Sequence, residues 1–185
     1  MSTSEEAITE IVVISLSGIA VFQSSKVAGD LFSEEIQDHF RRHHGMSIGL
    51  KTAEQIKIQV GSVVDDLINP PSPMMVRGKS IMEGLPVVCQ VDYREISGVL
   101  NKSITSIEES IVQTLETCPP ELAADIYLNG IHVTGGGALL RGLKERLERT
   151  IGLKAHIDAY PLLSVSKGYQ KRWGKVGSLR EYLFS

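Results

Sequence analysis

The N-terminal part of the chain opens with a short run of β-branched residues. Residues 11–14 read Ile-Val-Val-Ile, which is typical of a strand buried on both faces rather than of a half-exposed one. Residues 17–18 are Ser-Gly, a turn signal, and apolar residues resume at 19–22. The pattern predicts a β-hairpin.

Two helices are expected after the hairpin, from the spacing of apolar residues. The first ends at Gly45 and has an apolar stripe at every fourth position, made of Phe32, Ile36 and Phe40. The second is expected to open at Thr52, because Thr52 and Gln55 have the spacing of a capping box. Gly61 would weaken its middle. The buried side of this second helix would consist of Ile56, Val60, Val63 and Val64.

A proline-rich loop and two strands separate this region from the longest predicted helix. Residues 69–73 read Asn-Pro-Pro-Ser-Pro, and proline both removes backbone donors and restricts its neighbours. Short strands are expected around 74–76 and 85–91. Asp92 and Glu95 repeat the capping-box spacing, and the clearest periodicity in the chain follows them. Its apolar positions are Ile96, Leu100, Ile104, Ile107, Ile111 and Leu115.

The C-terminal third is organised around three consecutive glycines. A strand at 131–134 leads into Gly-Gly-Gly at 135–137, and an amphipathic helix is expected from Leu139 to Ile151, with Gly152 behind it. The remaining expected elements are a short helix at 121–127 that Pro119 and Pro120 begin, a half-buried strand at 153–157, and helical segments around 163–173 and 179–183.

Composition narrows the class of protein without pointing to a function. The chain has 185 residues, 42% hydrophobic and 22% charged, as expected of one ordinary globular domain or two small ones. A formal net charge of −3 argues against wholesale nucleic-acid binding. The two cysteines, Cys89 and Cys118, indicate reduced thiols. We find no signal-peptide pattern and no apolar run of membrane-spanning length, so we expect a soluble intracellular protein.

The unit of strand, three glycines and helix is the strongest chemical signal. Gly135, Gly136 and Gly137 would let a ligand approach the backbone with no Cβ in the way. The N-terminus of the next helix would favour a phosphate or another anion. The segment is neither a GxGxxG fingerprint nor a Walker A loop. Spacing alone leaves a ligand site and a merely tight turn equally favoured.

Two further groups of charged residues are weaker candidates. Glu54 and Lys57 lie three apart on one predicted helix and can project from one face, although a solvated ion pair is the favoured interpretation of that spacing. His39 and His43 have the i, i+4 spacing of a zinc helix, but the two arginines between them would repel a cation. We therefore predict no metal site, and no catalytic residue follows from any Ser, His and Asp spacing.

Five segments of the chain occur in a distinctive order. They are Val-Ile-Ser-Leu-Ser-Gly-Ile at 13–19, Val-Ala-Gly-Asp at 27–30, Thr-Ala-Glu-Gln-Ile-Lys-Ile at 52–58, Pro-Pro-Glu-Leu-Ala-Ala-Asp-Ile at 119–126, and Thr-Gly-Gly-Gly-Ala-Leu-Leu-Arg-Gly-Leu at 134–143. Taken together and in this order, they resemble the MreB family of bacterial actin-like, rod-shape-determining proteins. The resemblance covers residues 9–168.

The resemblance implies an α/β, actin-like (ribonuclease-H-like) ATPase fold. The chain would be its second lobe, with a small inserted α+β subdomain. Residues 1–27 and 92–160 would form the inner subdomain, residues 28–91 the small outer one, and residues 161–185 a C-terminal segment toward the first lobe. The family's adenosine contacts would carry over to nine positions. They are Glu54, Gln55, Ile56, Lys57, Gly135, Gly136, Gly137, Ala138 and Leu139.

ATP or ADP is therefore the expected ligand, with Mg²⁺ present only together with the nucleotide. The family's second phosphate loop, however, is replaced here by residues 3–9, in which Glu5 and Glu6 stand where phosphates would lie. Like charges repel there, so we expect negligible ATP hydrolysis by this chain alone.

The implied function is that of a cytoskeletal protein of cell-shape determination. It would be cytoplasmic, would self-associate or bind other actin-like or cell-shape proteins, and would meet a membrane only through partners. Two alternatives stay open: a fragment of an actin-fold ATPase or kinase relative that needs its first lobe, and a non-functional remnant.

Overall fold

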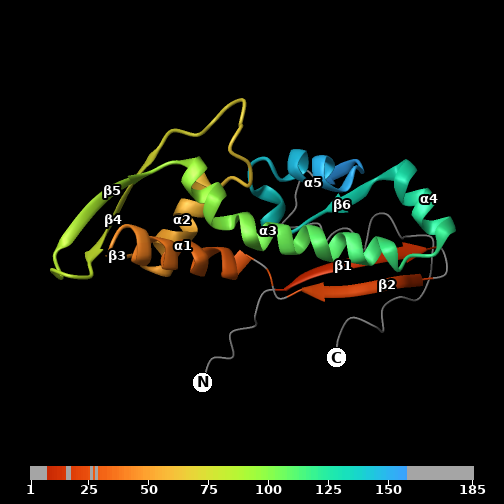
Figure 1. Ribbon diagram of the computed structural model, residues 1–185, viewed down its shortest axis with the longest axis horizontal. Coiled ribbons are helices and arrows are strands. Elements are labelled where there is room, and N and C mark those ends of the chain that lie inside the picture. The colour runs from red at the N-terminus through yellow and green to blue at the C-terminus, as the bar shows by residue number, and fades with distance from the viewer. Residues whose placement is uncertain (1–7, 16–17, 26, 28, 158–185) are drawn as a thin grey trace, which may run out of the picture.

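The described residues are arranged around one long helix, α3 (Tyr93–Glu116). The computed structural model describes residues 8–15, 18–25, 27 and 29–157. In Figure 1 the N-terminal hairpin lies along the C-terminal half of α3, while α1 (Gly29–His43) and α2 (Leu50–Val60) lie near its N-terminal half. Helix α5 (Leu143–Ile151) packs on α3 and, in this view, lies on the side of α3 opposite the hairpin. The fold is α/β, as predicted.

The predicted N-terminal hairpin is confirmed, but its predicted burial on both faces is wrong. Strands β1 (Thr9–Ser15) and β2 (Gly18–Ser25) pair antiparallel. One face packs on α3, where the Thr114 hydroxyl donates to the Gln23 side chain over 2.8 Å. Among the described elements, α3 covers this face and none covers the other. The apolar side chains left exposed are Val12, Ile14, Ile19 and Phe22.

Helix α1 forms as its apolar stripe predicts. Phe32 is 2% exposed, and Ile36 and Phe40 are fully buried. The helix ends at His43, two residues before Gly45, whose φ of +57° is a conformation that favours glycine. The stripe therefore fixes which face of α1 meets the core.

Helix α2 differs from its prediction at both ends. It begins at Leu50, and the carbonyl of Gly49 accepts the amides of Thr52 and Ala53, so no side chain caps it. The Thr52 capping box is therefore wrong, because Thr52 lies inside the helix, where the Gln55 amide that it would have capped belongs to the regular backbone ladder. The helix also ends at Val60, with Gly61 as its C-cap. Val63 and Val64 thus belong to the following segment.

A three-stranded antiparallel sheet covers the far end of α1 and α2. Its order is β3 (Met46–Ser47), β4 (Met74–Ser80) and β5 (Pro86–Val91), which confirms both predicted strands and extends the first. A Cβ at Gly78 would lie 2.6 Å from the Ser47 carbonyl oxygen, so the close approach of β3 to β4 requires glycine there. The proline loop before β4 contains no regular structure, as expected.

The predicted cap of α3 is confirmed in one half only. The Asp92 carboxylate accepts the Glu95 amide over 3.0 Å. The Glu95 side chain, however, turns to His39 and His44 instead of back to the cap residue. The Glu95 carboxylate therefore bonds to the two histidines and not to the N-terminus of its own helix.

The region after α3 follows the predicted order, with one correction. Helix α4 (Pro120–Asn129) precedes the parallel strands β6 (Ile131–Val133) and β7 (Ala155–Ile157). The glycines lead into a 3₁₀ turn, η1 (Gly136–Leu139), and α5 begins only at Leu143. The helix predicted from Leu139 is wrong because Leu140 is extended and Gly142 has a φ of +76°, which breaks the helical path.

One cluster of buried side chains runs through the described part of the chain. It joins residues of α1, α2, β4 and β5 to residues of α3 and α5.

The division into subdomains at residues 28 and 92 stays a prediction. Residues 158–185, with the last two predicted helical segments, lie outside the described residues. Within the described part, every helix is too short or too polar to cross a bilayer.

A buried ion pair joins α5 to α3. The Arg146 guanidinium donates to both carboxylate oxygens of Glu108, over 2.8 and 3.1 Å, and also to the Val63 carbonyl. The side chains of Arg146 and Glu108 are only 14% and 6% exposed. Arg146 reads as a surface residue in the sequence, but it is a buried cross-link between three segments.

We expect Arg146→Ala to lower the free energy of unfolding by about 3 kcal/mol, because it leaves the Glu108 charge buried without a partner. Urea denaturation would measure the change. The matched control is Arg149→Ala on the same helix, whose pair with Asp66 is exposed and should contribute less than about 1 kcal/mol. Equal losses in the two variants would contradict this assignment.

Candidate functional site

The first turns of α1 meet the middle of α2 at a small polar cluster. Lys57 Nζ lies 2.7 Å from Glu54 Oε2, as predicted from their spacing. The pair also reaches another helix. Ser33 Oγ donates to Glu54 Oε2 over 2.7 Å, and Lys57 Nζ donates to the Gly29 carbonyl over 2.9 Å. The ion pair therefore fastens α2 to the N-terminal end of α1 instead of standing free in solvent.

The two charges of this pair differ in their exposure. The Lys57 side chain is 14% exposed, whereas the Glu54 side chain is 45% exposed. Partial burial opposes ionisation of Glu54, but the hydrogen bonds from Lys57 and Ser33 outweigh burial and hold the pKa of Glu54 below its ordinary value of 4.5. At neutral pH the site therefore presents a carboxylate whose counter-charge is already in place.

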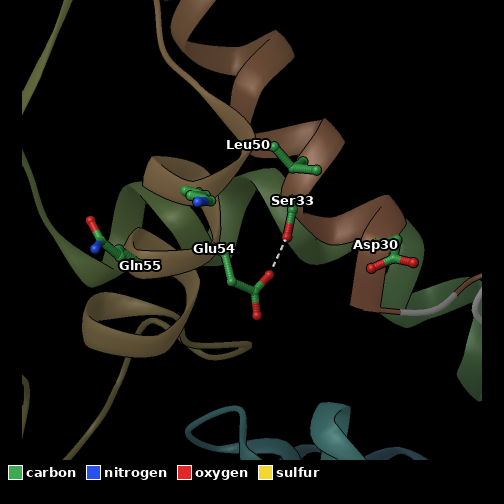
Figure 2. A pocket seen from close by; sticks show the side chains of 6 residues that line it. Asp30, Ser33, Leu50, Glu54 and Gln55 are labelled. Atoms are coloured by element: carbon green, nitrogen blue, oxygen red, sulfur yellow. Dashed lines mark hydrogen bonds between the residues drawn. The ribbon is translucent and has the colours of Figure 1, made fainter.

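An open pocket lies between α1 and α2 at this cluster. Its volume is about 360 Å³. Figure 2 shows Ser33 and Glu54 pointing toward each other, with the second oxygen of Glu54 turned away from Ser33. The side chains that line the pocket are Asp30, Ser33, Leu50, Lys51, Glu54 and Gln55.

The second candidate region is the glycine turn, residues 135–137, part of which is exposed. Gly135 has a φ of +88°, which explains a glycine at that position. Gly137 lies outside that range of φ, and a Cβ built on it would meet no atom of the described residues within 4 Å. Leu139 is exposed and Ala138 is buried. Within the described part of the chain, neither backbone conformation nor packing accounts for glycine at Gly137.

A seam between two loops holds α2 and the glycine turn at a fixed spacing. Ser62 and Arg141 form a parallel β-bridge, and the Val63 amide donates to the Arg141 carbonyl over 3.0 Å. The Arg141 guanidinium donates to the carbonyls of Ile58 and Gly61 at the C-terminal end of α2. A cation is well placed there, because the helix dipole is negative at that end.

The nine residues assigned by resemblance therefore fall into three groups. Glu54 and Gln55 line the pocket. Lys57 is not among the lining residues and donates to the Gly29 carbonyl. Residues 135–137 and 139 are wholly or partly accessible on the glycine turn. Ile56 is fully buried and Ala138 is 4% exposed, so both pack in the core. The altered loop of residues 3–9 lies mostly outside the described residues.

Two residues of this arrangement are missing from the sequence prediction. Ser33 was hidden inside a helical pattern, where a polar residue usually faces solvent, and Arg141 was quoted only as part of a motif. No local spacing links either residue to Glu54 or Gly61. The only available signal was chemical: the Ser33 hydroxyl and the Arg141 guanidinium can each form hydrogen bonds.

The comparisons with known proteins agree on one family. A family model described as MreB/Mbl protein matches residues 6–181. The chain belongs to the MreB/Mbl family. It is 39% identical over 160 residues to the cell shape-determining protein MreB of Escherichia coli (strain K12), and 38% identical over 160 residues to Mbl of Bacillus subtilis (strain 168). These alignments cover 86% of this chain but 46% and 47% of the relatives, so the chain spans about half the length of the MreB/Mbl proteins it matches.

Solved structures give the same assignment. The crystal structure of MreB5 of Spiroplasma citri bound to ADP superposes with a TM-score of 0.84 at 36% identity, covering 89% of this chain and 50% of that one. The AMPPNP-bound structure of the same protein also gives 0.84. A double helical filament of MamK, at 22% identity and a TM-score of 0.67, shares the fold. The actin-like fold expected of an MreB/Mbl protein is thus confirmed.

The lowered pKa of Glu54 predicts a pH-dependent contribution to stability. Because the folded-state pKa lies below the ordinary 4.5, the contribution is complete above the unfolded-state pKa and is lost as the pH falls through the folded-state value. Wild type should be more stable than Glu54→Gln at pH 7, and the difference should shrink toward pH 3. Denaturation curves across this range, with Glu109→Gln as a control for loss of an exposed carboxylate, would measure it. A difference that grows on acidification would contradict the sign.

Proposed function

We propose that this chain is a lobe of an MreB-type actin-like protein that acts in cell-shape determination through filament-type association. The observation that carries the proposal is the match of most of the chain to cell shape-determining proteins, in sequence and in structure. The proposed setting is the cytoplasm. Copies of the same protein or other cell-shape proteins are the proposed partners, and such partners would supply any contact with a membrane.

The proposed ligand of the site is an adenine nucleotide, held by its adenosine end. MreB5, which is similar to this chain, has been solved with ADP and with AMPPNP. The glycine turn fits that ligand, because Gly137 leaves space that atoms of the described residues do not fill. A planar base or a ribose needs such a close approach to backbone.

Glu54 is the proposed hydrogen-bond acceptor for a ribose hydroxyl. Ser33 and Lys57 both bind its Oε2 atom, and the other oxygen is turned away from Ser33 (Figure 2). Lys57 keeps the carboxylate ionised and in place without itself entering the pocket. Mg²⁺ would arrive only with the phosphates of the nucleotide, whose oxygens are its usual ligands.

An exposed apolar patch at the β4–β5 hairpin supports association between copies. The hairpin carries five large apolar side chains at its surface, more than a solvated turn requires. They are Met75, Ile81, Met82, Leu85 and Val88. In Figure 1 the hairpin lies at the end of the described structure opposite β1 and β2, and none of the five residues lines the pocket.

Gly137→Val should weaken adenosine binding by at least about tenfold, because the new side chain would occupy ligand space. Calorimetric titration of adenosine and of ADP would measure the affinities, which we expect to be similar to each other for the wild type. Gly98→Val is the matched control. It also adds a side chain at an open position, in a helix where valine is better tolerated than glycine. Equal weakening by both variants, or no adenosine binding by the wild type, would contradict the nucleotide proposal.

Met82→Asp should reduce the fraction of protein that pellets on ultracentrifugation, alone or with a full-length member of the family. A charge in the apolar contact would have to be desolvated. Ile68→Asp is the control, because Ile68 and Met82 are both 94% exposed but Ile68 lies outside the patch. Electron microscopy would show whether the pelleted wild type is filamentous. Loss of pelleting in both variants, or amorphous pellets, would count against this interface.

A further inference from the structure

Two histidines and a glutamate converge where α1 ends and α3 begins. His39 lies in α1, His44 follows its last residue, and Glu95 lies in the first turn of α3. The Nε2 atoms of His39 and His44 lie 2.6 and 2.5 Å from the same carboxylate oxygen, Glu95 Oε1. One ligand atom from each of the three side chains falls within 4.8 Å of the other two.

Arg41 and Arg42 were expected to repel a cation from this helix, but their charges are compensated elsewhere. Both guanidiniums pair with Asp38 and are 64% and 74% exposed. Their charge is therefore screened by solvent and balanced by a carboxylate. The two histidines also differ from the predicted pair of His39 and His43. In the structure, His44 lies beside Glu95 together with His39.

Aromatic packing fixes the orientation of both imidazoles. The His44 ring stacks on Phe40, with centroids 4.9 Å apart and planes 25° apart. Phe40 is fully buried, so it offers a rigid support. The His39 ring stacks on His43 at 4.5 Å. Supported ligands of this kind lose little freedom when they bind an ion.

We propose that His39, His44 and Glu95 bind a first-row divalent transition metal, with zinc as the representative ion. Two imidazole nitrogens and one carboxylate oxygen form a donor set that suits zinc and its neighbours better than calcium or magnesium. The side chains are 18%, 24% and 27% exposed, which leaves room for water at the remaining position. The ion would join the end of α1 to the start of α3.

Metal binding requires only a small opening of the cluster. Bonds of about 2.0–2.1 Å in tetrahedral geometry separate two ligand atoms by about 3.3 Å. Both nitrogens therefore need to move less than about 1 Å away from Glu95 Oε1. The carboxylate can supply this by rotating about its terminal bond, because terminal torsions of this type are soft.

The competing explanation is a metal-free hydrogen-bond cluster. Two neutral imidazoles could each donate an Nε2–H to Glu95 Oε1, which has two lone pairs. The two explanations differ in one measurable property. A hydrogen-bond cluster has no affinity for zinc beyond that of scattered surface histidines, whereas the proposed site binds one ion with all three side chains.

The test is calorimetric titration of Zn²⁺ into the full chain after treatment with a chelator, repeated with Co²⁺ to record its visible absorption. We expect one ion per chain, a tetrahedral Co²⁺ spectrum, and a higher melting temperature with Zn²⁺ present. His44→Gln and Glu95→Gln should each weaken Zn²⁺ binding by at least about tenfold, since loss of even an outer-shell partner costs 10–100-fold. Both substitutions keep a polar side chain of similar reach, so the fold should survive.

Two controls separate this site from other histidines. His43→Gln removes the ring that supports His39 but no proposed ligand, so it should weaken Zn²⁺ binding less than either ligand variant does. His156→Gln disrupts the stacked pair of His132 and His156, near the C-terminal end of the described residues, and should change the affinity by less than about twofold. Absence of one-to-one binding in the wild type, unchanged affinity in both ligand variants, or loss of binding only in His156→Gln would overturn the proposal.

Discussion

The buried ion pair between Arg146 and Glu108 is the constraint on which the candidate nucleotide site depends. It joins α5 to α3, and the same guanidinium donates to the Val63 carbonyl. Taking two charges out of water is unfavourable unless each finds partners. Arg146 meets that condition by also donating to Asn101 and Thr105. The geometry that satisfies the charges thereby sets where α5 and the residue 63 segment lie.

The position of the glycine turn depends on these contacts of Arg146. Residues 62–63 pair with Arg141, directly after the turn. The approach is so close that a Cβ on Gly142 would lie 2.3 Å from Val64, and one on Gly61 would lie 3.1 Å from Leu140. These two glycines allow the seam to close, whereas no described residue packs closely where a side chain on Gly137 would lie. The site is thus held by charge and close packing on one side and left open on the other.

Sequence periodicity predicted the elements whose faces meet the core, and little beyond them. The stripes of α1 and α3 were found because a buried helical face repeats every three or four residues. The start of α2 was missed because Gly49 supplies backbone acceptors that leave no side-chain signal. The roles of Arg146 and Ser33 were missed for a different reason: their partners lie 38 and 21 residues away. Side-chain hydrogen bonds and ion pairs at such separations leave no pattern in one sequence.

Helix α1 carries a polar site at each end, and its core determines how independent those sites are. Its first turns hold Glu54 and Lys57, and its end holds Glu95 through His39 and His44. Between them, Phe32, Ile36 and Phe40 are packed with almost no exposed surface. Because a close-packed interior transmits displacement and offers few alternative rotamers, α1 can respond to either site only by moving as a unit against α3. A ligand at one end would therefore influence the other through the position of the whole helix, and the coupling would be equal in both directions.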